Sequence, residues 1–191
     1  MKKLRISAAR ITALGGIIAS LSLLILLFSL LFPVMSLTLP AIAGLLLCVV
    51  VMEIGARFGL CVYFVVSVLT FLLPVHRESA ILYVLFFGIY PILKYLFERM
   101  DRLMCWSLKL IVFNLSAAIS YLLFSSAFGF NVILEASQFS NQIGFSSDVI
   151  LLGTVLLFFA NLCFLLYDYA VSIFIKLYRL RFQKLWHKLK R

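Results

Sequence analysis

The chain has 191 residues, of which 65% are hydrophobic and only 13% are charged, and its mean hydropathy is +1.17. A soluble domain of this length cannot bury so much apolar surface in one core, so the composition excludes an ordinary soluble globular protein. The formal net charge of +10 would favour nucleic acid as a partner of a soluble protein. Because the Lys and Arg residues flank apolar stretches, membrane topology and an anionic inner leaflet explain them better, and we expect no nucleic-acid binding.

Six apolar segments follow one another along the chain, and each approaches or exceeds the roughly 17–25 residues that a helix needs to cross a bilayer. The sequence therefore predicts an all-α, polytopic integral membrane protein with a bundle of six transmembrane helices. Residues 1–178 would form this domain, and residues 179–191 a basic cytoplasmic tail that extends the last helix. The first segment is too long for a signal peptide and lacks a small-residue cleavage site, so we expect a retained span. The six segments are Ile11–Phe32, Leu37–Ile54, Phe58–Val75, Ser79–Phe97, Leu108–Phe128 and Val149–Ile175.

The positive charges gather at one set of alternating ends of these segments. Sixteen of the 17 Lys and Arg residues lie at the chain ends or in the second and fourth links, Lys94 and Lys109 being counted in the fourth, whereas the other links hold only Arg77. The positive-inside rule then places both termini in the cytoplasm of a cell-membrane protein. The second and third segments are close to the short limit, and the alternative is that they form a re-entrant pair. That arrangement leaves four spans and the same orientation of the termini.

Two outer links carry polar residues that are candidates for substrate binding. One is the short turn with His76, Arg77 and Glu78, which has the charges to recognise an anionic or zwitterionic small molecule, although a lone histidine is more often a turn residue. The other is the long link between the last two segments, and loops of this length are often binding elements. A solvated connector is the alternative interpretation. The candidates in the long link are Asn131, Glu135, Gln138, Asn141 and Gln142.

Small residues recur along the start of the first segment, at Ala9, Thr12, Ala13 and Gly16. Small side chains let two helix backbones approach closely in a membrane. This spacing predicts either a docking face for another membrane protein or a face that packs against the chain's own helices.

Polar residues inside the apolar segments need partners, because an unpaired polar group in hydrocarbon is costly. Glu53 and Arg57 are four residues apart and can pair if one helix contains both. Asp168 and Asn161 are seven residues apart on nearly one helix face, and Asn114 of the preceding segment could meet that face. We expect a polar seam there, with Asp168 contacting either a partner protein or a nearby basic residue.

Motifs typical of enzymes are absent from the sequence, which has no HExxH, GxSxG, Walker or GxGxxG pattern. The four cysteines show no CxxC spacing, and no cluster of metal ligands is evident. We therefore expect no catalytic residues, no metal and no cofactor. Pro91 inside the fourth segment predicts a kink.

The six segments, the inward termini and the AxxxA pattern from Ala9 to Ala13 resemble the substrate-binding S-component of energy-coupling factor (ECF) transporters. The middle of the chain, notably YVLFFGIYPILKYLFER, is also similar to uncharacterised small membrane proteins of Gram-positive bacteria. The resemblance implies that Ala9 and Ala13 dock onto a transmembrane coupling protein, which sits with two ATPase subunits. It also implies that a small molecule such as a vitamin is captured by the outer ends of the helices.

Three functions compete at this point. A substrate-binding transport subunit predicts a polar-lined cavity open to the outer face near His76. A membrane scaffold in envelope assembly, sporulation or division predicts a filled bundle with partner contacts at the basic cytoplasmic surface. An intramembrane enzyme requires Asp168, Asn161 and Glu53 to converge on one wet pocket. We favour the transport subunit.

Overall fold

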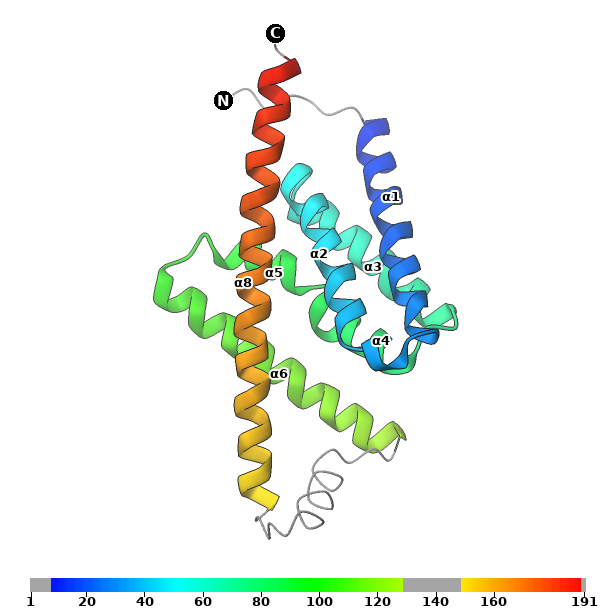
Figure 1. Ribbon diagram of the computed structural model, residues 1–191, viewed down its shortest axis with the longest axis vertical. Helices are drawn as coiled ribbons and strands as arrows, with labels where there is room; N and C mark the ends of the chain where they lie inside the picture. The colour runs from blue at the N-terminus through cyan, green and yellow to red at the C-terminus, as the bar shows by residue number, and fades with distance from the viewer. Residues whose placement is uncertain (1–7, 129–148, 190–191) are drawn as a thin grey trace.

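The computed structural model describes residues 8–128 and 149–189, which are helical throughout apart from short turns and contain no β-strand. The elements are α1 (Ala8–Leu27), η1 (Phe28–Leu30), η2 (Pro33–Met35), α2 (Thr38–Glu53), α3 (Ala56–Leu72), α4 (Arg77–Leu82), η3 (Tyr83–Phe87), α5 (Tyr90–Phe97), α6 (Arg102–Phe128) and α8 (Val149–Leu189). Figure 1 shows α1, α2 and α3 on one side of the long C-terminal helix α8, which α6 crosses.

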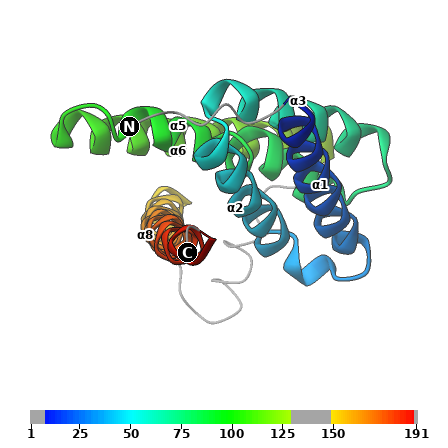
Figure 2. The same cartoon turned by 90° about the horizontal axis from the view of Figure 1, so that it is seen from above.

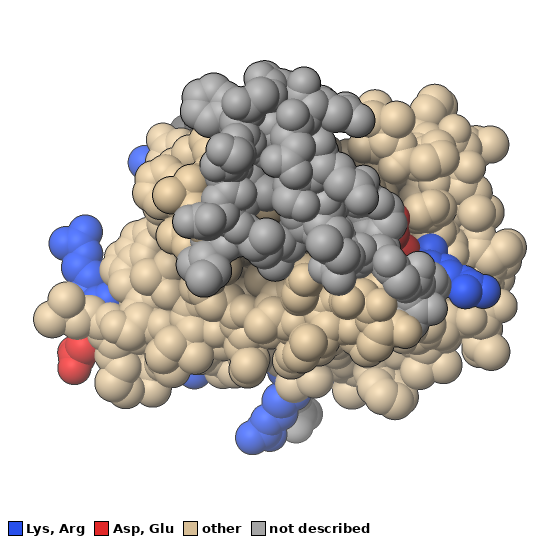
Figure 3. All heavy atoms as spheres, turned by 90° about the horizontal axis from the view of Figure 1, so that it is seen from below, with Lys and Arg blue, Asp and Glu red and all other residues tan. Residues whose placement is uncertain are grey.

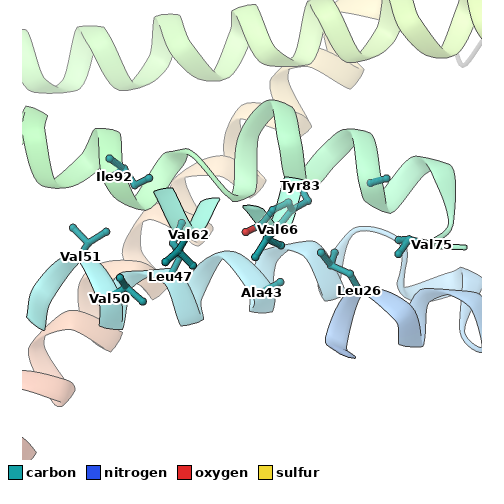
Figure 4. Close-up of a cluster of buried hydrophobic side chains, with 11 residues drawn as sticks. Leu26, Ala43, Leu47, Val50, Val51, Val62, Val66, Val75, Tyr83 and Ile92 are labelled. Carbon is teal, nitrogen blue, oxygen red and sulfur yellow. The ribbon is translucent and has the colours of Figure 1, made fainter. Parts of the chain in front are cut away.

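The helices α1, α2 and α3 pack on one another and on α4 and η3 through aliphatic side chains and Tyr83. Figure 4 shows this core, in which Leu26, Ala43, Leu47, Val50 and Val66 are fully buried. Two tight turns make the packing possible. Pro33 starts the η2 turn between α1 and α2, and Gly55, with φ of 121°, forms the sharp turn between α2 and α3. A residue with a Cβ rarely adopts a φ of this sign, which explains why a glycine occupies position 55.

The predicted fourth span is divided into three helical pieces. The N–H of Gly88 donates to the carbonyl of Tyr83 at 2.7 Å, a bond across five residues that makes η3 a π-helical turn. Pro91 then opens α5 and has no N–H to donate to Phe87. The expected break is present, but the π-turn before it was not predicted.

A glycine of α2 accommodates this irregular segment. A Cβ on Gly44 would fall on the backbone carbonyl of Phe87 and would also meet the hydroxyl of Tyr167. The absence of a side chain therefore lets the α2 backbone lie directly against the last residue of η3. This contact fixes where α5 begins, and with it the position of Lys94.

The helices α6 and α8 cross rather than run side by side. In Figure 1 α8 follows the long axis of the molecule and α6 slopes across it, and in Figure 2 α8 is seen end-on while α6 is seen lengthwise. Many of their apolar side chains are exposed, including Leu103, Ile111, Leu122, Phe158 and Leu166. In the view from below in Figure 3, most of the surface outside the grey residues is likewise uncharged, with a few charged side chains. Such a surface fits lipid better than water.

Four helical stretches among residues 8–128 and 149–189 are long and apolar enough to cross a membrane: Ile11–Leu30, Arg77–Phe97, Arg102–Ser126 and Gly153–Arg181. The helices α2 and α3 are apolar but shorter, with 16 and 17 residues. The all-α class is thus confirmed for the described residues, and four of their helical stretches are compatible with membrane spans. The six-span topology and the cytoplasmic termini stay predictions.

Candidate functional site

Three buried charged side chains and two polar partners join α5, α6 and α8. The charged residues are Lys94, Lys109 and Asp168, and the partners are Tyr90 and Ser172; we call the five the charge cluster. The side chains of Lys94, Lys109 and Asp168 are 0%, 6% and 7% exposed. Both ammonium groups approach the same carboxylate oxygen, Oδ1 of Asp168, and the Nζ of Lys109 lies 3.1 Å from it. The hydroxyl of Tyr90 donates to that oxygen as well. Three helices therefore meet at one carboxylate.

Lys94 has oxygen partners for each of its three N–H donors. Besides Asp168 Oδ1, its ammonium donates to the Asp168 carbonyl and to Ser172 Oγ, both at 2.7 Å. The Ser172 hydroxyl in turn donates to the Asp168 carbonyl at 2.9 Å. The Glu98 carboxylate lies 3.9 Å from the Lys94 ammonium. A buried ammonium needs such a complete set of acceptors to offset its lost hydration.

Lys109 is less completely surrounded. Its ammonium donates to Asp168 Oδ1 and lies 5.2 Å from the centre of the Trp106 ring, a cation–π contact. Within residues 8–128 and 149–189 it has no second oxygen partner. Two buried lysines thus share one buried aspartate, and the nearby second carboxylate, Glu98, pairs with Lys94.

Aromatic rings pack on the charge cluster along α8 and η3. Phe113 and Phe164 stack with their centroids 4.7 Å apart, and Phe86 lies 5.0 Å from Tyr90 and 6.0 Å from Tyr167. Phe86, Phe164 and Tyr167 pack on the Tyr90 ring, whose hydroxyl binds Asp168, and such an apolar surrounding strengthens ion pairs. The arrangement is suited to holding charge inside a membrane protein, where ionisable residues commonly mark functional sites.

The polar seam predicted around Asn161 has two separate parts. Asn114 and Asn161 exchange side-chain amide hydrogen bonds of 3.2 and 3.1 Å between α6 and α8, as their positions predicted. Asp168, two turns further along α8, contacts basic residues, which is one of the two alternatives left open. The seam therefore joins α8 to α6 at two levels.

Glu53 and Arg57 could pair only on one continuous helix, and that condition is not met, because α2 ends at Glu53 and α3 begins at Ala56. Glu53 instead accepts a hydrogen bond of 3.0 Å from the hydroxyl of Tyr178 on α8, and Arg57 is exposed. Glu53, Asn161 and Asp168 thus have three different partners. They do not converge on the one pocket that an intramembrane enzyme would require.

At the turn before α4, the predicted substrate residues are partly engaged in packing the helix ends together. The His76 N–H donates to Ser29 Oγ at 3.2 Å, and the neighbouring Ser79 hydroxyl donates to the Ser36 carbonyl at 3.0 Å. The His76 imidazole lies 4.0 Å from the Glu78 carboxylate. These contacts tie the turn to the α1–α2 connection.

Arg77 of this turn lines an open depression of about 360 Å³ between the end of α3 and α4, whose other lining residues include Thr70, Phe71 and Ile81. Its walls are largely apolar, unlike the polar lining that was predicted. The other candidates for the substrate site, Asn131, Glu135, Gln138, Asn141 and Gln142, lie outside the described residues.

The small residues of α1 differ in their exposure. Ala9, Thr12, Ala13 and Gly16 are all exposed, and a Cβ on Gly16 would meet nothing within 4 Å. The adjacent Gly15 is buried, and a Cβ there would press on Phe58 and Val62 of α3. Gly15 thus packs against α3, whereas Ala9, Thr12, Ala13 and Gly16, which we call the α1 strip, are exposed.

Sequence reasoning missed Lys94, Lys109 and Tyr90 as members of the site. Both lysines were counted in the fourth link, whereas the structure places them in α5 and α6 with buried ammonium groups. One signal was available: Tyr90 and Lys94 are four residues apart within an apolar run, so they share a helix face, and a lysine on such a face needs an acidic partner.

No protein-family model matches the chain, and comparisons with curated proteins and with solved structures find no significant match.

Proposed function

We propose that this chain is the membrane-embedded substrate-binding subunit of an ECF-type uptake transporter for a small molecule such as a vitamin. In this proposal the α1 strip docks onto a transmembrane coupling protein, and two ATPase subunits bound to that protein supply the energy. Six helices cross the membrane with both termini in the cytoplasm, and the substrate is captured at the outer ends of the helices.

The exposure of the α1 strip is the observation that carries the proposal. Ala9, Thr12, Ala13 and Gly16 leave one exposed face of α1 without bulky side chains, and a Cβ on Gly16 would meet nothing within 4 Å. Helices associate in membranes through such faces because close backbone approach gains dispersion contacts.

A further feature supports a transport role. The depression beside Arg77 opens at the end of the molecule that the charge distribution places outside the cell. A subunit that captures a solute from outside needs an opening on that side.

Substituting Ala13 by Leu is expected to abolish association with the coupling protein, because the larger side chain keeps the two helix backbones apart. The measurement is affinity purification of the tagged chain, co-expressed with the coupling protein and ATPases of its host, followed by quantification of the recovered ATPase. We expect at least a tenfold loss of recovery, which is roughly 1.4 kcal/mol of binding free energy.

Ala118→Leu is the matched control, because it makes the same change at an exposed position of α6 that lies outside the α1 strip. It should leave recovery unchanged. If the unsubstituted chain recovers no coupling protein, or recovers only proteins of envelope assembly or division, the transport proposal fails and the scaffold interpretation takes its place.

A further inference from the structure

We propose that Lys109 and Trp106 at the start of α6 form a binding site for a phosphate group, supplied by the headgroup of an anionic phospholipid. The site lies outside the α1 strip and the depression beside Arg77, and the proposed transport function does not depend on it.

The first argument is the charge balance of the cluster. Asp168 Oδ1 receives both ammonium groups, while the second carboxylate, Glu98, lies 3.9 Å from Lys94. Lys94 therefore has Glu98 beside its share of Asp168, whereas Lys109 has only its share of Asp168. A buried ammonium group that is incompletely paired favours an additional anion.

The second argument is the donor capacity of Lys109. An ammonium group has three N–H donors, and the described residues supply one oxygen acceptor, Asp168 Oδ1 at 3.1 Å, and one aromatic ring. A phosphate oxygen is a strong acceptor for the remaining donors, and lysine binds phosphate as a point charge.

The third argument is depth in the membrane. Trp106 is 41% exposed and holds the Lys109 ammonium 5.2 Å from its ring centre. Tryptophan is enriched at the level of lipid headgroups, so this pair marks the turn of α6 that lies near lipid phosphates. Lys109 is only seven residues from Arg102, the first residue of α6, which is roughly 10 Å of helix.

The fourth argument is the surrounding charge. Arg102 is exposed one turn before Trp106, and Arg99 lies just before it, stacked on the Tyr95 ring at 4.7 Å. Under the orientation predicted from the charge distribution, this end of α6 faces the anionic inner leaflet. Groups of basic residues on the cytoplasmic side of transmembrane helices are known to attract anionic lipid headgroups. These observations favour a lipid over a soluble phosphate.

The test compares thermal unfolding of the purified full chain in neutral detergent after addition of phosphatidylglycerol, phosphatidylcholine or inorganic phosphate. A ligand that binds the folded state raises the unfolding midpoint. We expect phosphatidylglycerol to raise it by several degrees, phosphatidylcholine to raise it far less, and the Lys109→Met substitution to remove most of the rise.

Lys176→Met is the matched control, because it removes one exposed lysine of α8 on the same predicted side of the membrane. Its phosphatidylglycerol response should equal that of the unsubstituted chain. A Lys109-dependent rise with inorganic phosphate alone would replace the lipid by a soluble phosphate as the ligand. Equal responses to the two lipids, or a full response in Lys109→Met, would overturn the proposal.

Discussion

Substituting Asp168 by Asn should destabilise the protein by about 3–5 kcal/mol, the cost expected for breaking a buried ion pair by removing one partner. The substitution keeps the size of the side chain but leaves the ammonium groups of Lys94 and Lys109 without their shared carboxylate. Tyr90 would also lose the charge of its acceptor. The measurement is the free energy of unfolding in mixed micelles titrated with a denaturing detergent.

A matched control for this prediction is Asp101→Asn, since Asp101 is an exposed acidic residue in the turn before α6. That change should stay within about 0.5 kcal/mol of the unsubstituted chain, as is usual for surface positions. Replacing Asp168, Lys94 and Lys109 together by Leu, Met and Met should recover most of the loss, because an apolar set of similar volume removes every buried charge. A loss below about 1 kcal/mol for Asp168→Asn would show that the charge cluster does not hold α8 in place.

Substituting Gly44 by Ala should cost about 3 kcal/mol, at the upper end of the range for overpacking a core. The new Cβ would fall on the backbone carbonyl of Phe87, which cannot rotate away as a side chain could. Relieving the clash requires moving η3 relative to α2, and with it the start of α5. The same unfolding measurement checks the prediction.

Gly16→Ala is the control, because it makes the identical change at a position where the Cβ meets nothing within 4 Å. There the gain in helix propensity should stabilise the chain by up to about 1 kcal/mol. Opposite signs at Gly44 and Gly16 are therefore expected. Equal effects at both would mean that α2 does not lie against η3 as described.

The sequence predicts the helical class and the positions of the apolar stretches well, because lipid leaves only a few ways to satisfy the backbone. It also predicts the break before Pro91, which follows from the missing N–H of proline. The π-turn at Tyr83–Phe87 and the angle between α6 and α8 could not be predicted, since both depend on contacts such as Gly44 with Phe87 that are distant in the chain.

In the candidate site, too, the sequence predicts some contacts and not others. The meeting of Asn114 and Asn161 follows from helix periodicity and the need of buried amides for partners. The burial of Lys94 does not, because its partner Asp168 is 74 residues away and a lysine near a helix end ordinarily reaches the headgroups. For Glu53 the local spacing indicated Arg57 as the partner, but the turn at Gly55 separates these two residues. The partner of Glu53 is instead Tyr178 of α8, which is distant in the chain.

The most direct test of the proposed docking is photo-crosslinking in the living host from a reactive amino acid placed at position 13 or 16 of the α1 strip. Identification of the adducts by mass spectrometry should give the transmembrane coupling protein that also binds the two ATPases. The same reactive group at position 118 of α6 should give none of that protein. Adducts from position 13 or 16 that contain only lipid or this chain itself would contradict the proposed function.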